Sequence, residues 1–123
     1  MLTIRVRVRY DPGMLRSARS ERLDAVFDAL ANASRREIVA RLVRGPLTTP
    51  EIGVHFDFSK QALNRHVELL EAAGIVTRKS RGRVHELRLV PGPLDGVTRW
   101  IGELRRGWAA SLDRLDEVLN EPT

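Results

Sequence analysis

Four polar side chains near the middle of the chain have the types and spacing needed to read the edges of DNA bases. Gln61 and Asn64 each carry a donor and an acceptor on one planar amide, which matches N6 and N7 of adenine. Arg65 carries a planar fork of donors that matches O6 and N7 of guanine. Together with Lys60, these residues share one face of an α-helix, so they would face a single groove. A solvated helix face with ordinary polar residues is the alternative.

The helix that would carry these residues has clear ends in the sequence. Ser59 is a good N-cap, and its hydroxyl and the unpaired N–H groups of the first turn suit a phosphate. Gly74 is a good C-terminal stop. An apolar stripe at helical spacing predicts the inward face, which consists of Leu63, His66, Val67 and Leu70. On this stripe, His66 is expected to be a packed or phosphate-facing histidine rather than a metal ligand.

A second basic cluster follows directly, in a predicted β-hairpin. Strands are expected over residues 76–80 and 83–90, joined at Arg81-Gly82. Strand alternation predicts that Lys79, Arg81 and Arg83 point to one side, where like charges repel and a polyanion would relieve the repulsion. An arginine at the tip would fit the minor groove. The alternative is a solvated turn.

Three helices are expected to precede these two elements. The first covers residues 21–30. The second begins at Ser34, which would form a capping box with Glu37, and stops at Gly45-Pro46. The third is short, over residues 50–56, with a threonine cap and a proline in its first turn. The apolar positions assigned to these helices are Leu23, Val26, Phe27, Leu30, Ile38, Val39, Leu42, Val43, Ile52, Val54 and Phe56.

The last predicted helix, over residues 93–120, carries apolar residues at alternating steps of three and four. Such a repeat is typical of a helix that pairs with another helix, most simply with its twin. The small helical core cannot cover so long a stripe, although packing on the subunit's own first helix is the alternative. The stripe predicts a dimer interface made of Leu94, Val97, Ile101, Leu104, Trp108, Leu112, Leu115 and Val118.

The N-terminal segment has a different pattern. Residues 1–10 alternate between apolar side chains and polar or basic ones, which predicts a β-strand that Asp11-Pro12-Gly13 would end with a turn. Its arginines would either follow a phosphate backbone as part of an arm or form the solvent-exposed face of an added strand. The alternative is that Met14 is the natural start.

Composition limits the class of protein. With 123 residues, 42% of them hydrophobic, the chain suits one compact domain. The lack of cysteine excludes disulfides and thiolate metal sites, and no apolar run suits a membrane span or a signal peptide, so a cytoplasmic location is expected. The net charge of +5 favours a polyanionic partner. No set of residues suited to catalysis is evident, so an enzyme is not expected.

Three strings, in this order and spacing, resemble those of the ArsR-type winged-helix regulators. Residues 29–38 (ALANASRREI) resemble the junction of that family's first two helices, residues 45–52 (GPLTTPEI) the lead-in to the third, and residues 59–76 the recognition helix and its exit. The resemblance covers about residues 21–120. It implies a mainly α fold with a small β-hairpin wing (α+β), namely a winged helix-turn-helix with a long C-terminal dimerisation helix.

The resemblance also implies a function and its residues. It implies a homodimeric transcriptional regulator, usually a repressor, that binds a palindromic double-stranded DNA operator. By position, the DNA contacts fall on Ser59, Lys60, Gln61, Asn64, Arg65, Lys79, Arg81 and Arg83. The family's founding metal sensors carry thiols near positions 48 and 50, and other members use His and carboxylates on the last helix, which here contains no His. No metal or other cofactor is therefore expected, and any small-molecule or protein effector would act elsewhere.

The expected organisation is one compact domain in three parts. These are an N-terminal strand or arm (residues 1–18), a winged helix-turn-helix core (19–92) and a C-terminal dimerisation helix (93–123). The alternative function is a winged-helix module that binds a partner protein without operator specificity. Such a module would expose apolar residues on the helix at 59–74, and the sequence pattern assigns none to its outer face.

Overall fold

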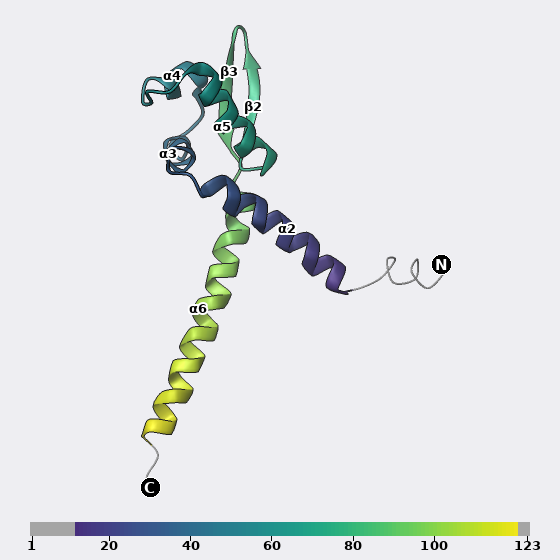
Figure 1. Cartoon of the computed structure of the whole chain (residues 1–123), viewed down its shortest axis with the longest axis vertical. Coiled ribbons are helices and arrows are strands. Elements are labelled where there is room, and N and C mark those ends of the chain that lie inside the picture. Colours follow the sequence, from purple (N-terminus) through teal and green to yellow (C-terminus); the bar gives the residue numbers. More distant parts are fainter. Residues whose placement is uncertain (1–11, 121–123) are drawn as a thin grey trace, which may run out of the picture.

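The computed structural model describes residues 12–120, with side chains from Arg19 onward (Figure 1). The strand predicted over residues 1–10 lies outside this range. The elements are α2 (Pro12–Leu30), α3 (Ala33–Leu42), β1 (Leu47–Thr48), α4 (Thr49–Gly53), α5 (Lys60–Ala72), β2 (Val76–Arg81), β3 (Val84–Leu89) and α6 (Gly92–Leu119). The expected architecture is confirmed, since the chain is mainly helical with a small antiparallel sheet and a long C-terminal helix.

The helices and the hairpin form a head from which two rods extend. In Figure 1, α3, α4 and α5 gather beside the hairpin β2–β3, while α2 and α6 leave the head in diverging directions. The sheet has the antiparallel order β1-β3-β2. None of the helices in the described part of the chain combines the length and the apolar character needed to cross a bilayer.

One apolar core holds the head together. The buried side chains come from α2, α3, α4, α5 and the sheet, so each element contributes its apolar face to the same cluster. Burial of a Leu, Ile or Val side chain contributes about 1.5–3 kcal/mol, so this cluster dominates the stability of the head. The largest fully buried residues are Ile38, Ile52, Leu70, Ile75, Leu87 and Val67.

The first helix begins earlier than the sequence predicted. Asp11-Pro12-Gly13 predicted a turn, whereas α2 starts at Pro12 and runs to Leu30. Proline is well suited to the first turn of a helix because its missing N–H would have no partner there. The turn prediction was therefore wrong, and residues 12–18 are helical rather than part of a strand.

The cap of α3 also differs from the prediction. Asn32, not Ser34, is the N-cap, and its Oδ1 accepts a hydrogen bond from the Arg35 N–H at 3.1 Å. Glu37 does not close a capping box with Ser34. It pairs instead with Arg41 one turn further on, at 2.9 Å. Asparagine and serine are about equally good caps, so the sequence did not distinguish them.

Three predicted core positions are exposed, and the first of them is Phe27 on α2, which is 38% exposed. Val43 and Val54 are 69% and 80% exposed, because each follows the last residue of its helix and leaves the buried face. α4 ends at Gly53, three residues earlier than predicted. Phe56 remains partly buried outside the helix, where its ring stacks on Phe58 at 4.8 Å.

Thr48 connects the sheet to α4. Its backbone pairs with Glu86 in the strand ladder β1–β3, which the sequence did not predict. Its side chain caps α4 by accepting from the Glu51 N–H at 3.3 Å, while the Thr48 N–H donates to the Glu51 carboxylate at 2.8 Å. These two hydrogen bonds lower the pKa of Glu51. The predicted threonine cap is thus confirmed as part of a capping box.

Candidate nucleic-acid interface

The helix α5 is fixed at both ends by local hydrogen bonds. The Ser59 hydroxyl accepts from the Ala62 N–H at 3.1 Å, which confirms the predicted N-cap and leaves the hydroxyl proton able to donate to a phosphate. At the other end Gly74 adopts a left-handed φ of 77°, and the Ile75 N–H donates to the Leu70 carbonyl at 3.0 Å. This is the Schellman arrangement that favours glycine.

The two faces of α5 match the amphipathic prediction. Leu63, Val67 and Leu70 are buried in the core. The opposite face presents the side chains with base-reading chemistry, and all of them are exposed: Lys60, Gln61, Asn64 and Arg65. The core contacts of the inner face therefore hold the polar face in a fixed orientation, as reading of a groove requires.

Asn64 differs from its neighbours because its amide is already engaged. Its Oδ1 accepts a hydrogen bond from Nη1 of Arg78 on β2 at 2.6 Å, and its Nδ2 donates to Oε1 of Glu68 at 2.7 Å. Nε and Nη2 of Arg78 both donate to Oε1 of Glu71, at 3.2 and 2.7 Å. The hairpin and the helix are thus joined through one arginine.

His66 forms a second link, on the inner side of α5. Nη1 of Arg35 lies 3.2 Å from its Nδ1, and because a guanidinium only donates, Nδ1 must accept and the ring must be neutral. Arg35 also donates to the Ala29 carbonyl at 2.6 Å, and the His66 ring packs against Phe58 at 5.1 Å. Burial, followed by the positive charges of Arg35 and Arg65, lowers the pKa of His66.

Sequence reasoning missed Arg35 and Arg78 as organising residues. Arg35 joins α2, α3 and α5, contacts that no local pattern specifies. For Arg78 a signal did exist, because strand alternation from the apolar Val76 places it on the inner face of the hairpin, where a charge needs a partner. The predicted packing of His66 is confirmed, since it is partly buried.

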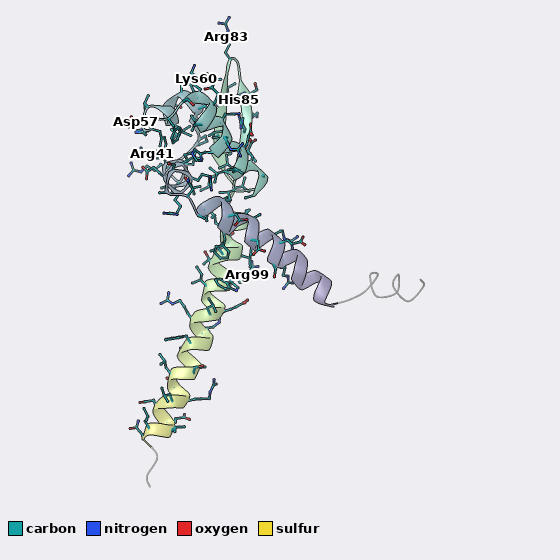
Figure 2. All side chains as sticks on the ribbon, viewed as in Figure 1. Arg41, Asp57, Lys60, Arg83, His85 and Arg99 are labelled. Atoms are coloured by element: carbon teal, nitrogen blue, oxygen red, sulfur yellow. The ribbon has the colours of Figure 1, made fainter. Side chains whose placement is uncertain are left out.

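The hairpin carries its charges differently from the prediction. Arg83 lies in the two-residue loop with Gly82, which has a φ of 64°, so strand alternation does not place it with Lys79 and Arg81. Arg81 pairs with Glu86 at 3.3 Å, which offsets part of the expected repulsion between like charges. Figure 2 shows Arg83 at the tip of the hairpin, at the end of the molecule opposite α6.

The apolar stripe of α6 divides into two parts. Leu94 and Val97 are partly buried against the core of the head. Beyond them the stripe faces solvent on the single chain, with these exposed fractions: Ile101 42%, Leu104 52%, Trp108 70%, Leu112 49%, Leu115 54% and Val118 64%. Trp100 lies beside the stripe and makes an edge-to-face contact with Phe27 of α2, with ring centroids 5.6 Å apart.

Within residues 12–120 there is no group of three or more His, Cys, Asp or Glu side chains that could hold a metal ion. A capped helix with a polar outer face, followed by a basic hairpin, is the arrangement that winged helix-turn-helix proteins use to bind DNA.

Comparison with known proteins identifies the family. A family model described as a helix-turn-helix domain matches residues 30–79. The chain is 32% identical over 97 residues to the HTH-type transcriptional regulator Rv2034 of Mycobacterium tuberculosis, covering 79% of this chain and 88% of that protein. It is 30% identical over 79 residues to the transcriptional repressor SdpR of Bacillus subtilis, covering 64% and 88%.

A solved structure agrees. The crystal structure of the ArsR family transcriptional regulator RHA00566 superposes with a TM-score of 0.70 at 32% identity, covering 73% of this chain and 93% of that one. This chain therefore belongs to the ArsR family of helix-turn-helix transcriptional regulators. It is a DNA-binding regulator and not an enzyme.

Proposed function

We propose that this regulator is a homodimeric repressor that reads a palindromic DNA operator with one α5 helix from each subunit. The observation that carries the proposal is the exposed polar face of α5, which presents amide and guanidinium groups above a rigid apolar core. Such groups discriminate base pairs in the major groove, each well-placed bidentate pair contributing about 1–3 kcal/mol. The N-terminus of the same helix favours a nearby phosphate.

The two ends of the interface have different roles in this proposal. Gln61, Asn64 and Arg65 read bases, while Lys60 and Ser59 fix the register of the helix on the duplex. On the wing, Lys79, Arg81 and Arg83 meet the backbone, with Arg83 at the tip suited to the minor groove. Glu86 lies beside Arg81 and offsets part of its attraction for a phosphate.

A second subunit follows from α6. The helix has 28 residues, a length of about 42 Å at 1.5 Å per residue, and its apolar stripe continues beyond the head. Pairing two such helices buries the stripe and yields a symmetric dimer, in which the two α5 helices can meet half-sites about 34 Å apart. Residues 93–123 then serve dimerisation and residues 19–92 bind DNA. A DNA operator as partner implies a cytoplasmic location.

Repression is supported by the similarity to SdpR, itself a transcriptional repressor. A dimer seated on an operator that overlaps a promoter would exclude polymerase without any further activity. Any small-molecule or protein effector would act away from the positions that hold metals in other members of the family.

One observation bears on the alternative of a protein-binding module. The sequence assigned no exposed apolar residue to the outer face of α5, but Leu69 is 41% exposed. That expectation was wrong at this position. A single exposed leucine is ordinary for a globular surface and does not form a docking patch. DNA binding therefore remains the better account of this face.

Selection of binding sites from a library of random duplexes tests the proposal. The full chain is expected to enrich an inverted repeat whose half-sites lie one helical turn, about 10 base pairs, apart. Arg65→Ala should enrich a sequence that has lost its preference at one or two positions of each half-site. Recovery of sequences without any repeat would refute operator reading by a dimer.

A further inference from the structure

We propose that Arg78 is a positioning residue for base reading: it holds the amide of Asn64 in one orientation, so that Asn64 recognises an adenine on one strand only. This inference rests on the proposed function, to which it adds a specificity role for an arginine that does not itself contact DNA.

Arg78 lies on the inner face of the hairpin. In the register of β2 and β3 it faces Leu87, which is fully buried, and the neighbouring inward residue Val76 is also buried. The side chain of Arg78 is only 15% exposed. By contrast, Lys79 and Arg83 are exposed, the latter at the outermost point of the wing (Figure 2). Arg78 thus points toward α5 and not toward solvent.

All three nitrogens of the Arg78 guanidinium are engaged. Nε and Nη2 hold the carboxylate of Glu71 on one edge, and Nη1 reaches Asn64 on another. Because Glu71 and Asn64 occupy different edges, the planar fork fixes both at once. Every nitrogen of this guanidinium has a partner, and the two N–H protons that remain, one on Nη1 and one on Nη2, belong to a side chain that is largely buried between the hairpin and α5.

The partners of Asn64 determine which way its amide points. A guanidinium only donates, so Oδ1 must face Arg78; an ionised carboxylate only accepts, so Nδ2 must face Glu68. A flipped amide would place two donors against each other and two acceptors against each other. Asn64 therefore has one fixed polarity along the helix, which an exposed asparagine without partners would not have.

The engaged amide can still read a base. An amide oxygen has a second lone pair and an amide nitrogen has a second proton, and neither is used by the network. Outward, Asn64 can therefore accept from N6 and donate to N7 of adenine. Because the amide cannot flip, this pairing fits an adenine in one orientation relative to α5, which distinguishes A·T from T·A. Fixing the side chain before binding also removes its ordering cost.

The acidic members of the network favour specificity over general affinity. Glu68 and Glu71 lie on α5, and their negative charges oppose the approach of a polyanion. Arg78→Lys would keep one charge to pair with Glu71, but it would lose the planar fork that holds Glu71 and Asn64 on two separate edges. The network thus weakens binding to any DNA while it orients one base-reading group.

The test compares variants of the full chain on the selected operator and on operators changed at one base pair. Asn64→Ala should identify the base pair in each half-site that Asn64 reads. Arg78→Met removes the donors and keeps an apolar stem. It should lower the preference at that same base pair by about 5-fold, a part of what one bidentate contact contributes. In the Asn64→Ala background, Arg78→Met should lower it no further.

Two further readouts separate positioning from a structural or a phosphate role. Arg78→Lys retains a charge beside Glu71 and should fold normally, yet it should lose the same preference as Arg78→Met. The slope of affinity against salt should not change in either variant. The matched control is Arg83→Ala, which should weaken binding to all sequences and reduce the slope by about one, while the preference stays as in the wild type.

The possible outcomes distinguish a positioning role of Arg78 from a phosphate contact, and the failure of this role from the failure of the proposed function. Equal weakening on all sequences with a smaller salt slope in Arg78→Met, and recovery of both affinity and slope in Arg78→Lys, would make Arg78 a phosphate contact and overturn the inference. Wild-type preference in both variants would overturn it as well. If Asn64→Ala keeps every preference while the inverted repeat is still recovered, the inference fails and the proposed function stands. If no repeat is recovered, both fail.

Discussion

Replacement of Trp108 by alanine gives a direct test of the dimer. Trp108 lies in the middle of the α6 stripe and is 70% exposed on the single chain. Because it contacts little within its own subunit, its removal should leave the folding of the head unchanged. If α6 pairs with its twin, the same replacement should strongly weaken association, since two copies of the ring are lost from one interface.

The magnitude follows from the exposed area. A tryptophan can bury up to about 250 Å², and 70% of that is about 175 Å² available to a partner. At about 25 cal/mol per Å², full burial would contribute about 4 kcal/mol per subunit. The entropy lost on ordering the interface offsets part of the free energy gained by burial. We therefore take about half of that value, which is about 2 kcal/mol per subunit and about 4 kcal/mol per dimer. The dissociation constant should rise about a thousandfold.

Sedimentation across a dilution series, with fluorescence detection for low concentrations, measures this dissociation constant. Arg106→Ala is the matched control, because Arg106 lies on the same helix but on the side opposite Leu104 and Trp108. The control should dimerise like the wild type. If Trp108→Ala also does so, or if it unfolds the head, the assignment of the stripe to a dimer interface is wrong.

Three other predictions concern base reading, capping and pH. Arg65→Ala should cost about 1–3 kcal/mol of discrimination at one or two base pairs, measured by competition between operators; unchanged discrimination would remove Arg65 from the reading face. Thr48→Ala should lower the free energy of unfolding by about 1 kcal/mol, because α4 loses its cap, and an unchanged urea midpoint would contradict this. The pKa of His66 is lowered in the folded protein, chiefly by burial, so the unfolded chain protonates first. Its contribution to stability should be complete above about pH 6.5 and decline as the pH falls below that value. His66→Gln, whose amide can accept from Arg35, should flatten this decline in urea unfolding measured across pH, and a wild-type pH profile in the variant would contradict the assignment.

The sequence predicted best where local signals are sufficient. Ser59 and Gly74 bound α5 through contacts within a few residues, and Gly82 marks the turn of the hairpin because a positive φ is needed there. The apolar period of α6 was long enough to define the whole helix. In each case the residues that determine the structure lie close together in the sequence, and the packing of distant segments is not needed to predict it.

The sequence predicted less well where two local signals compete. Pro12 is equally suited to a reverse turn and to the start of a helix, and in the structure it begins α2. At the start of α3, Asn32 and Ser34 are comparable caps, and the structure uses the earlier one. Val54 has the right character for a core residue, but it follows the end of α4 and faces solvent.

The organisation of the site depends on contacts far apart in sequence. Asn64 and Arg78 are 14 residues apart, and Arg35 and His66 are 31 apart. The sequence identified Asn64 by its chemistry, but nothing local stated that its amide would be held by an arginine of the wing. Such hydrogen bonds can be predicted only when the packing of the hairpin on the helix is known. The sequence therefore predicted which side chains could read bases, but it did not predict the residues that hold them in place.

Hydroxyl-radical footprinting of the full chain on its selected sequence tests the central claim most directly. Two symmetric sets of protected backbone positions should appear, centred about 10 base pairs apart, and both should be lost together when Trp108→Ala is tested at concentrations where it is monomeric. One protected half-site bound by a single subunit, or continuous protection that ignores sequence, would contradict a dimer that reads successive major grooves.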